Sequence, residues 1–137
     1  MRTRLAQLGA AAALLVTAVA VPAGLRPETA AAQPAGVTQV PIIMGDYYFS
    51  PSAITVKVNE PIQFVLPNLG TERHRVLFQI EGAADRVRSD EDAGLGEIVV
   101  LNQTFTVPGV YRMWCSFATD GVSHRDLGMN GTLTVVE

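Results

Sequence analysis

The chain has 137 residues, 48% of them hydrophobic and 17% charged, which is enough apolar sequence for one domain with its own core. Its formal net charge of −3 argues against a nucleic-acid partner, because such a protein would need a basic face. A single cysteine excludes a disulfide within the chain.

The first 32 residues have the pattern of a secretory signal peptide. Arg2 and Arg4 make a basic start, residues 8–23 are apolar, and three alanines at 30–32 offer a cleavage site, with a cut after Ala23 as the second choice. An uncleaved anchor is the alternative, but the apolar run has about 16 residues where a spanning helix needs ~20. We therefore predict a periplasmic or extracellular protein with no membrane span in the mature chain. Residues 33–137 carry 12 acidic and 7 basic side chains, a net charge of −5.

Residues 33–40 are predicted to be a linker and residues 41–137 a single domain. The domain consists of short runs rich in β-branched and aromatic residues, separated by turn residues. This pattern is typical of an all-β sandwich or barrel. The charged stretch 80–96 is expected to be a solvated loop with one short helical turn. The predicted strands are 40–44, 47–49, 54–58, 62–66, 75–80, 97–101, 103–107, 110–115 and 131–136.

Four residues in this chain form a pattern that is typical of copper ligands. Cys115, His124 and Met129 lie within fifteen residues, in the pattern Cys-x8-His-x4-Met, and His74 is the only other histidine. A thiolate, two imidazoles and a thioether form the ligand set of a type 1, or blue, copper site, in which the thioether is the weak axial ligand. We predict these four residues as metal ligands, one copper per chain and no catalytic residue.

Three of the four residues also have an ordinary explanation when taken alone. Cys115 could be a buried core residue, Met129 could serve packing, and His124 could be a surface histidine. Other metals fit the combination less well, because structural zinc takes four strong ligands and catalytic zinc keeps an open position. No Cys-x-x-Cys-His motif for covalent haem is present.

Four segments around these residues resemble the cupredoxins, the small blue-copper proteins that include plastocyanin, azurin and halocyanin. The resemblance covers residues 48–137 and implies a Greek-key β-sandwich, a type 1 copper and one-electron transfer. The segments are FSPSAITV at 49–56, NLGTERH at 68–74, YRMWC at 111–115 and GMNGTLTV at 128–135.

The chain departs from the simplest cupredoxins at two places. Eight residues separate Cys115 from His124, where plastocyanin and azurin have few, and this spacing is similar to the type 1 site of copper nitrite reductase. That enzyme needs a second, histidine-bound copper, but this chain has Trp114 and Gln79 where the resemblance would require histidines. Arg75 also stands where many members have an asparagine that links the ligand segments, so the tuning of the metal is expected to differ.

The function predicted from the sequence is an exported one-electron carrier, which is not an enzyme. It would act as a monomer with a redox protein partner such as a cytochrome or an oxidase, and without nucleic acid. The first alternative is a periplasmic copper-binding or delivery protein without a redox role. The others are an enzyme similar to nitrite reductase and a metal-free interaction module.

The electron is expected to enter at the end of the domain that carries the ligand loop. In the cupredoxin fold the loop histidine usually has its second ring nitrogen at the surface, so His124 is predicted to face solvent and His74 to be enclosed. An apolar patch around His124 would be the docking face. The alternative is that two of its members, Phe117 and Leu127, only pack the loop onto the domain. The predicted patch comprises Leu69, Phe117, Ala118, Val122 and Leu127.

Overall fold

The computed structural model describes residues 36–137, and the predicted signal peptide lies outside them. The described residues form strands and connecting loops without a helix, and therefore without any helix long and apolar enough to cross a membrane. The strands are β1 (Thr38–Pro41), β2 (Ile43–Gly45), β3 (Tyr48–Ser50), β4 (Ala53–Lys57), β5 (Pro61–Pro67), β6 (Leu77–Ile80), β7 (Val87–Arg88), β8 (Ile98–Thr104), β9 (Gly109–Trp114), β10 (Ala118–Thr119), β11 (Val122–Ser123) and β12 (Asn130–Val136).

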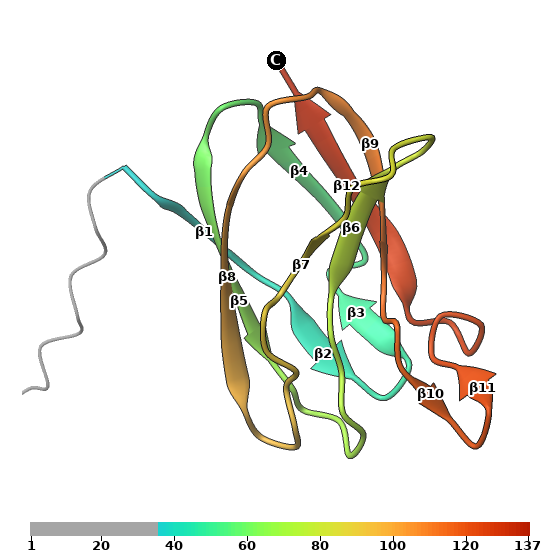
Figure 1. The fold of residues 1–137 in the computed structure, drawn as a ribbon. Helices are drawn as coiled ribbons and strands as arrows, with labels where there is room; N and C mark the ends of the chain where they lie inside the picture. The colour runs from blue at the N-terminus through green and yellow to red at the C-terminus, as the bar shows by residue number, and fades with distance from the viewer. Residues whose placement is uncertain (1–35) are drawn as a thin grey trace, which may run out of the picture. The chain divides into compact units, whose positions relative to one another are not determined.

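Two sheets pack face to face as a sandwich (Figure 1). One sheet has the order β1-β5-β8, and the other has the order β4-β12-β9-β6-β7. The last strand, β12, lies between β4, to which it is parallel, and β9, to which it is antiparallel. The all-β Greek-key sandwich predicted from the sequence is therefore confirmed.

The core forms because apolar residues alternate along the central strands. In β5, Ile62, Phe64 and Leu66 are buried, while the residues between them are partly exposed. This period of two sends alternate side chains to opposite faces of a sheet. Phe64 packs against Phe78 of β6 with ring centroids 5.0 Å apart, so the two sheets share an aromatic centre. Side chains of this size each stabilise the fold by about 1.5–3 kcal/mol when fully buried.

The strands differ from the sequence predictions in several places, and the predicted strand 40–44 is divided into β1 and β2 at Ile42. Residues 97–101 and 103–107 were predicted as two strands, but one strand, β8, runs from Ile98 to Thr104 because Asn102 and Gln103 continue the ladder with β5, and residues 105–107 lie outside it. The short helical turn predicted within 80–96 is wrong, since β7 pairs there with β6. Strand β1 begins at Thr38, inside the predicted linker 33–40, and pairs with β5 through backbone positions 38–41.

The loops at one end of the sandwich position the candidate site. The β2–β3 turn, the β5–β6 connection and the β10–β11 hairpin gather at the end opposite the C-terminus (Figure 1). The hairpin lies within the eight-residue stretch between Cys115 and His124, which was predicted as part of the ligand loop. Its turn places Asp120 and Gly121 at positive φ, 52° and 80°, as a tight two-residue hairpin requires.

Candidate metal centre

Three of the four predicted ligands are held by hydrogen bonds within their own loop. Cys115 directly follows β9, and its backbone N–H donates to the carbonyl of Met129 at 3.2 Å. The N–H of Met129 donates in turn to the carbonyl of His124 at 2.9 Å. His124 follows β11, and its N–H donates to the carbonyl of Phe117 at 2.8 Å. All of these bonds join residues of the same loop, so the loop itself brings the three residues together.

The fourth predicted ligand, His74, comes from the connection between β5 and β6. It exchanges two backbone hydrogen bonds with Ala93, at 3.0 and 2.9 Å. Asn68 stabilises this connection, since its fully buried amide donates to the carbonyls of Glu72 and Ala93. His74 is therefore placed by the distant Ala93 together with Asn68 of the same connection.

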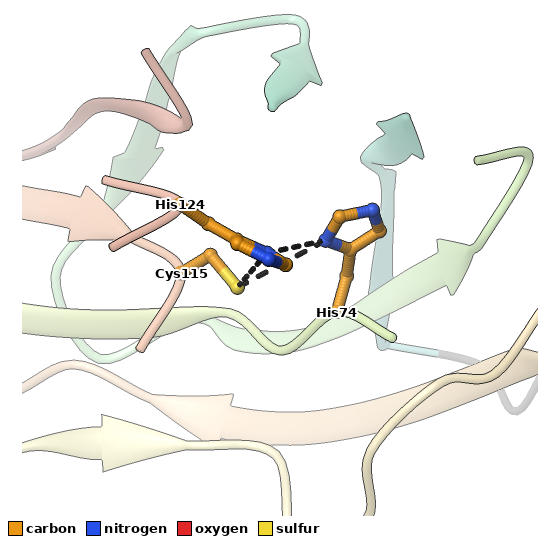
Figure 2. Close-up of side chains that lie close together, drawn as sticks. All are labelled: His74, Cys115 and His124. Atoms are coloured by element: carbon orange, nitrogen blue, oxygen red, sulfur yellow. Dashed lines mark hydrogen bonds between the residues drawn. The ribbon is translucent and has the colours of Figure 1, made fainter. Parts of the chain in front are cut away.

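The two segments bring three donor atoms into one buried cluster (Figure 2). Cys115 Sγ lies 4.0 Å from Nδ1 of His74 and 3.6 Å from Nδ1 of His124, and the two Nδ1 atoms are 3.3 Å apart. The side chains of all three residues are at most 1% exposed. Met129 is fully buried as well, and its backbone bonds place it between Cys115 and His124.

The spacing of the donors fits a single metal ion. With metal–nitrogen distances of about 2.0 Å and a metal–sulfur distance of about 2.3 Å, a trigonal ion separates its nitrogens by about 3.5 Å and each nitrogen from the sulfur by about 3.7 Å. The separations of 3.3 to 4.0 Å bracket these values. Two ring nitrogens and a sulfur that face one another are also an arrangement that a cation can stabilise.

The surroundings of Cys115 act on the pKa of its thiol in two opposite directions. Burial raises the pKa of the thiol, while the backbone N–H groups of Phe117 and Arg75 bond to the sulfur and act in the opposite direction. Metal binding requires the thiolate, so a bound cation would have to displace the thiol proton. The two N–H donors would then stabilise the negative sulfur.

His124 does not face solvent, and the sequence prediction on this point is wrong. The ring is 1% exposed, and its second nitrogen, Nε2, lies 2.8 Å from the hydroxyl of Thr119. Tyr47 packs edge-on against the same ring with centroids 5.1 Å apart. The β10–β11 hairpin, which carries Thr119, folds back over the histidine. His74 is enclosed, as predicted.

The ring of His74 is fixed on its far side by a carboxylate. Nε2 lies 3.2 Å from Oδ1 of Asp46 in the β2–β3 turn. Backbone N–H groups of Glu72 and Thr71 hold the pKa of the Asp46 carboxyl far below its usual range, so this carboxylate is ionised. Burial lowers the pKa of the His74 imidazole, although the hydrogen bond to Asp46 acts against this. The histidine is therefore neutral near neutral pH, as a metal ligand must be.

Arg75 links the two ligand segments through its guanidinium group, at the position where many cupredoxins have an asparagine. Its guanidinium lies over the ring of Phe117, 5.2 Å from the centroid, and its Nε donates to Oδ1 of Asp92 at 2.6 Å. Arginine over an aromatic face is favourable by about 0.5–1 kcal/mol when exposed and more when desolvated. Through these contacts the segment after His74 is tied to the loop after Cys115.

The predicted apolar patch is partly exposed. Leu69 is 66% exposed, Val122 45% and Leu127 44%. Phe117 is only partly exposed because it packs between Arg75 and the ring of His124. Apolar side chains are thus present at this end of the molecule, but none of them leaves the imidazole of His124 open to a partner.

Three polar residues next to the histidines were missed in the sequence. Asp46 is 28 positions from His74, and Glu72 is 47 positions from Thr119, so no local spacing connects either pair. Thr119 stands five residues before His124 and could have been suspected from a predicted hairpin over the Asp120-Gly121 turn.

Comparison with known proteins identifies the family. A family model described as the cupredoxin-like domain matches residues 10–135. The chain belongs to the cupredoxin-like family. Plastocyanin of Dryopteris crassirhizoma is 31% identical over 101 residues, which cover 67% of this chain and 91% of the plastocyanin.

Solved cupredoxin structures share the fold. The reduced auracyanin of Roseiflexus castenholzii is 20% identical and superposes with a TM-score of 0.62 over 73% of this chain and 98% of its own. Auracyanin A of Chloroflexus aurantiacus, described as a blue copper protein, is 19% identical, with a TM-score of 0.61 over 73% and 99% of the two chains. Family membership and the convergent donor set confirm the predicted cofactor, one type 1 copper per chain, while the assignment of individual ligands is a proposal.

Proposed function

We propose that this cupredoxin carries single electrons through one type 1 copper ion. Its trigonal ligands would be Nδ1 of His74, Sγ of Cys115 and Nδ1 of His124, with the sulfur of Met129 as the axial ligand. The observation that carries the proposal is the meeting of these three donor atoms in a dry pocket at the separations a trigonal ion needs. Copper would supply the one-electron couple, and no substrate would be transformed.

The surroundings of the ligands support electron transfer. A carrier works best when its ligands move little between the two oxidation states. Backbone bonds hold Cys115, His124 and Met129 to one another, and Asp46 holds the ring of His74. The pocket also excludes water, because every proposed ligand is at most 1% exposed.

The alternative of copper delivery is less well supported by the same observations. A delivery protein has to release its ion to a partner, which requires ligands that a partner can reach. Here the β10–β11 hairpin and the Thr119 hydroxyl cover His124. Slow loss of copper to an excess of chelator would support the carrier, whereas rapid loss would favour delivery.

The decisive experiment is the visible spectrum of the protein after addition of copper(II). We expect an intense thiolate-to-copper absorption at about one copper per chain. Cys115→Ser is expected to abolish it, because a hydroxyl is not a soft anionic donor, and Met129→Gln is expected to keep the colour and lower the potential. A colourless copper complex would refute the blue-copper assignment. Two tightly bound ions, or turnover of nitrite, would point to an enzyme instead.

Export and the redox partner complete the proposal. Residues 1–32 have the pattern of a signal peptide, so the mature protein is proposed to begin at Gln33 and to act in the periplasm or outside the cell. Mass spectrometry of the N-terminal peptide tests the cut. A redox protein such as a cytochrome or an oxidase would dock near Val122 and Leu127. Lysine at either position is expected to slow electron exchange and leave the copper spectrum unchanged; unaltered rates in both variants would exclude this face.

A further inference from the structure

The two imidazoles are oriented alike with respect to the pocket. In each ring Nδ1 faces Cys115 Sγ, and Nε2 points away toward an oxygen atom of the protein. Among residues 36–137 no buried side-chain nitrogen or oxygen lacks a hydrogen-bond partner. What the outer nitrogens contact therefore decides which nitrogen of each histidine carries the proton.

For His74 the contact of Nε2 permits one position for the ring proton. Its Nε2 lies 3.2 Å from the Asp46 carboxylate, which can only accept hydrogen bonds when it is ionised. Three other donors already converge on this carboxylate, from the Thr71 and Glu72 backbones and the Thr71 hydroxyl. The proton of His74 therefore sits on Nε2, and the lone pair of Nδ1 faces the pocket.

For His124 the same tautomer follows from the contact of Nε2 with a hydroxyl group. Thr119 Oγ1 lies 2.8 Å from Nε2 of His124 and 3.1 Å from Oε2 of Glu72. A hydroxyl has one proton to donate. When that proton goes to the Glu72 carboxylate, the Thr119 oxygen must accept from Nε2–H, and Nδ1 of His124 is again left free for a metal.

Glu72 joins the hydrogen bonds behind His74 and those behind His124 into one network. Its backbone N–H donates to Asp46 at 3.1 Å, while its carboxylate receives the Thr119 hydroxyl. Its carbonyl accepts from the buried amide of Asn68 at 2.7 Å. The network therefore reaches from the β2–β3 turn, through the residue two positions before His74, to the hairpin that covers His124.

We propose that Asp46 and Glu72 are positioning residues that hold both histidines as Nε2–H tautomers, Asp46 directly and Glu72 through Thr119. The inference rests on the proposed copper site, and it names the residues that would set the copper affinity and the reduction potential of that site. Carboxylates behind metal-bound histidines orient the rings and make them more basic. Two negative charges behind the ligands also favour copper(II) over copper(I), so they lower the reduction potential. The same contacts close the ring edge of His124 to water.

The tautomers can be measured without copper. The chain has two histidines, so nitrogen-15 spectra of metal-free protein labelled at histidine contain two imidazoles. At about pH 8, above the ordinary histidine pKa of about 6.5, both rings are expected to carry the proton on Nε2. Thr119→Val, which keeps the shape of the side chain, should let His124 populate both tautomers, and Thr119→Ser should restore the wild-type spectrum. An Nδ1–H signal from either ring of the wild type would overturn the inference.

The copper-loaded protein supplies the second measurement. Thr119→Val is expected to bind copper(II) about 10- to 100-fold more weakly. Asp46→Asn and Glu72→Gln keep an acceptor but remove a charge, so each should raise the reduction potential, by 59 mV for every tenfold change in the ratio of copper(II) to copper(I) affinity. The control is Thr71→Val, which removes one bond to Asp46 and leaves the carboxylate in place.

The outcomes separate this inference from the proposed function. A wild type that turns blue, with Asp46→Asn and Glu72→Gln shifting the potential no more than Thr71→Val, would overturn the positioning role and leave the carrier intact. A wild type that stays colourless would overturn the carrier, while the spectra of the metal-free protein would still decide the tautomers. If Thr119→Val does not fold, Glu72→Gln tests the same relay at a partly exposed side chain.

Discussion

The two segments that supply the proposed ligands are built in opposite ways. The loop from Cys115 to Met129 is held by backbone hydrogen bonds among its own residues, over fifteen positions. The connection that carries His74 is held by residues far away in the chain, namely Asp46 on one side and Ala93 on the other. The difference indicates that changes in the loop have local effects, whereas changes around His74 affect the fold and the metal together.

The largest effect is expected at Asn68, the buried residue that organises the His74 connection. Its amide donates to two carbonyls, and its Oδ1 accepts from the N–H of Gly70 at 2.9 Å. Asn68→Ala leaves these groups unpaired, at about 1–3 kcal/mol each where they stay dry, so the free energy of unfolding is expected to fall by about 3 kcal/mol. Copper affinity should fall with it. Denaturant titration and copper titration measure the two quantities.

The matched change is Asn130→Ala, at the first residue of β12 directly after the loop. The exposed Asn130 amide makes one hydrogen bond, to the carbonyl of Arg125 at 3.2 Å. Its loss is expected to change the free energy of unfolding by no more than about 0.5 kcal/mol. Equal losses in the Asn68 and Asn130 variants would break the distinction between the two segments.

A pair of glycines sharpens the same comparison. A Cβ on Gly70 would lie 2.7 Å from the backbone nitrogen of Asp46 and closer still to its carboxylate. Gly70→Ala is therefore expected to cost about 2 kcal/mol of stability, within the usual range for overpacking, and to weaken copper binding by displacing Asp46. In the hairpin, Gly121 has open space around it but φ of +80°. Gly121→Ala should cost about 1 kcal/mol through strain alone.

Copper affinity distinguishes these two glycine variants better than stability does. Gly70→Ala should reduce it, whereas Gly121→Ala should leave it close to that of the wild type, because the turn lies outside the contacts to His124. Competition with a chelator of known affinity provides the measurement. A large loss of affinity in Gly121→Ala would mean that the hairpin is as tightly coupled to the metal as the His74 connection.

The smallest effect expected is on the acid stability of the metal-free protein. The folded-state pKa of Asp46 is depressed, so its carboxylate stabilises the fold above its unfolded pKa of about 3.9, and this contribution is lost as the pH falls further. The lowered pKa of His74 reduces the stability of the fold at a higher pH than Asp46 does, because the unfolded chain takes up a proton at His74 below about pH 6.5. Asp46→Asn should flatten the part of the profile below about pH 4, and it should also lower the pKa of His74 further, because the hydrogen bond from Asp46 no longer raises it.

Asp126→Asn is the control for this measurement in the ligand loop. Asp126 is exposed and, among residues 36–137, forms an ion pair with its neighbour Arg125. An exposed pair of this kind contributes little to stability, so the variant should follow the wild-type profile. A profile for Asp46→Asn that also coincides with the wild type would mean that Asp46 does not stabilise the His74 connection.

Much of the fold followed from local patterns. Strands β4, β5, β9 and β12 lie close to their predicted ranges, because alternating apolar residues bounded by turn residues specify a half-buried strand with little help from the rest of the chain. The short strands β7, β10 and β11 were not predicted. Two-residue strands are too short for a period of two to be visible, and they exist because a neighbouring segment is available for pairing.

The sequence by itself determined the all-β class, the family and the candidate donors. Donor chemistry resides in the residues themselves, and the spacing from Cys115 to Met129 is short enough for one loop. Only the tertiary structure decided which contacts surround those donors. It brought Asp46 to His74 across 28 positions, and Glu72 to Thr119 across 47. It also buried His124, because whether a long loop extends into solvent or folds back as a hairpin depends on the surface available to receive it.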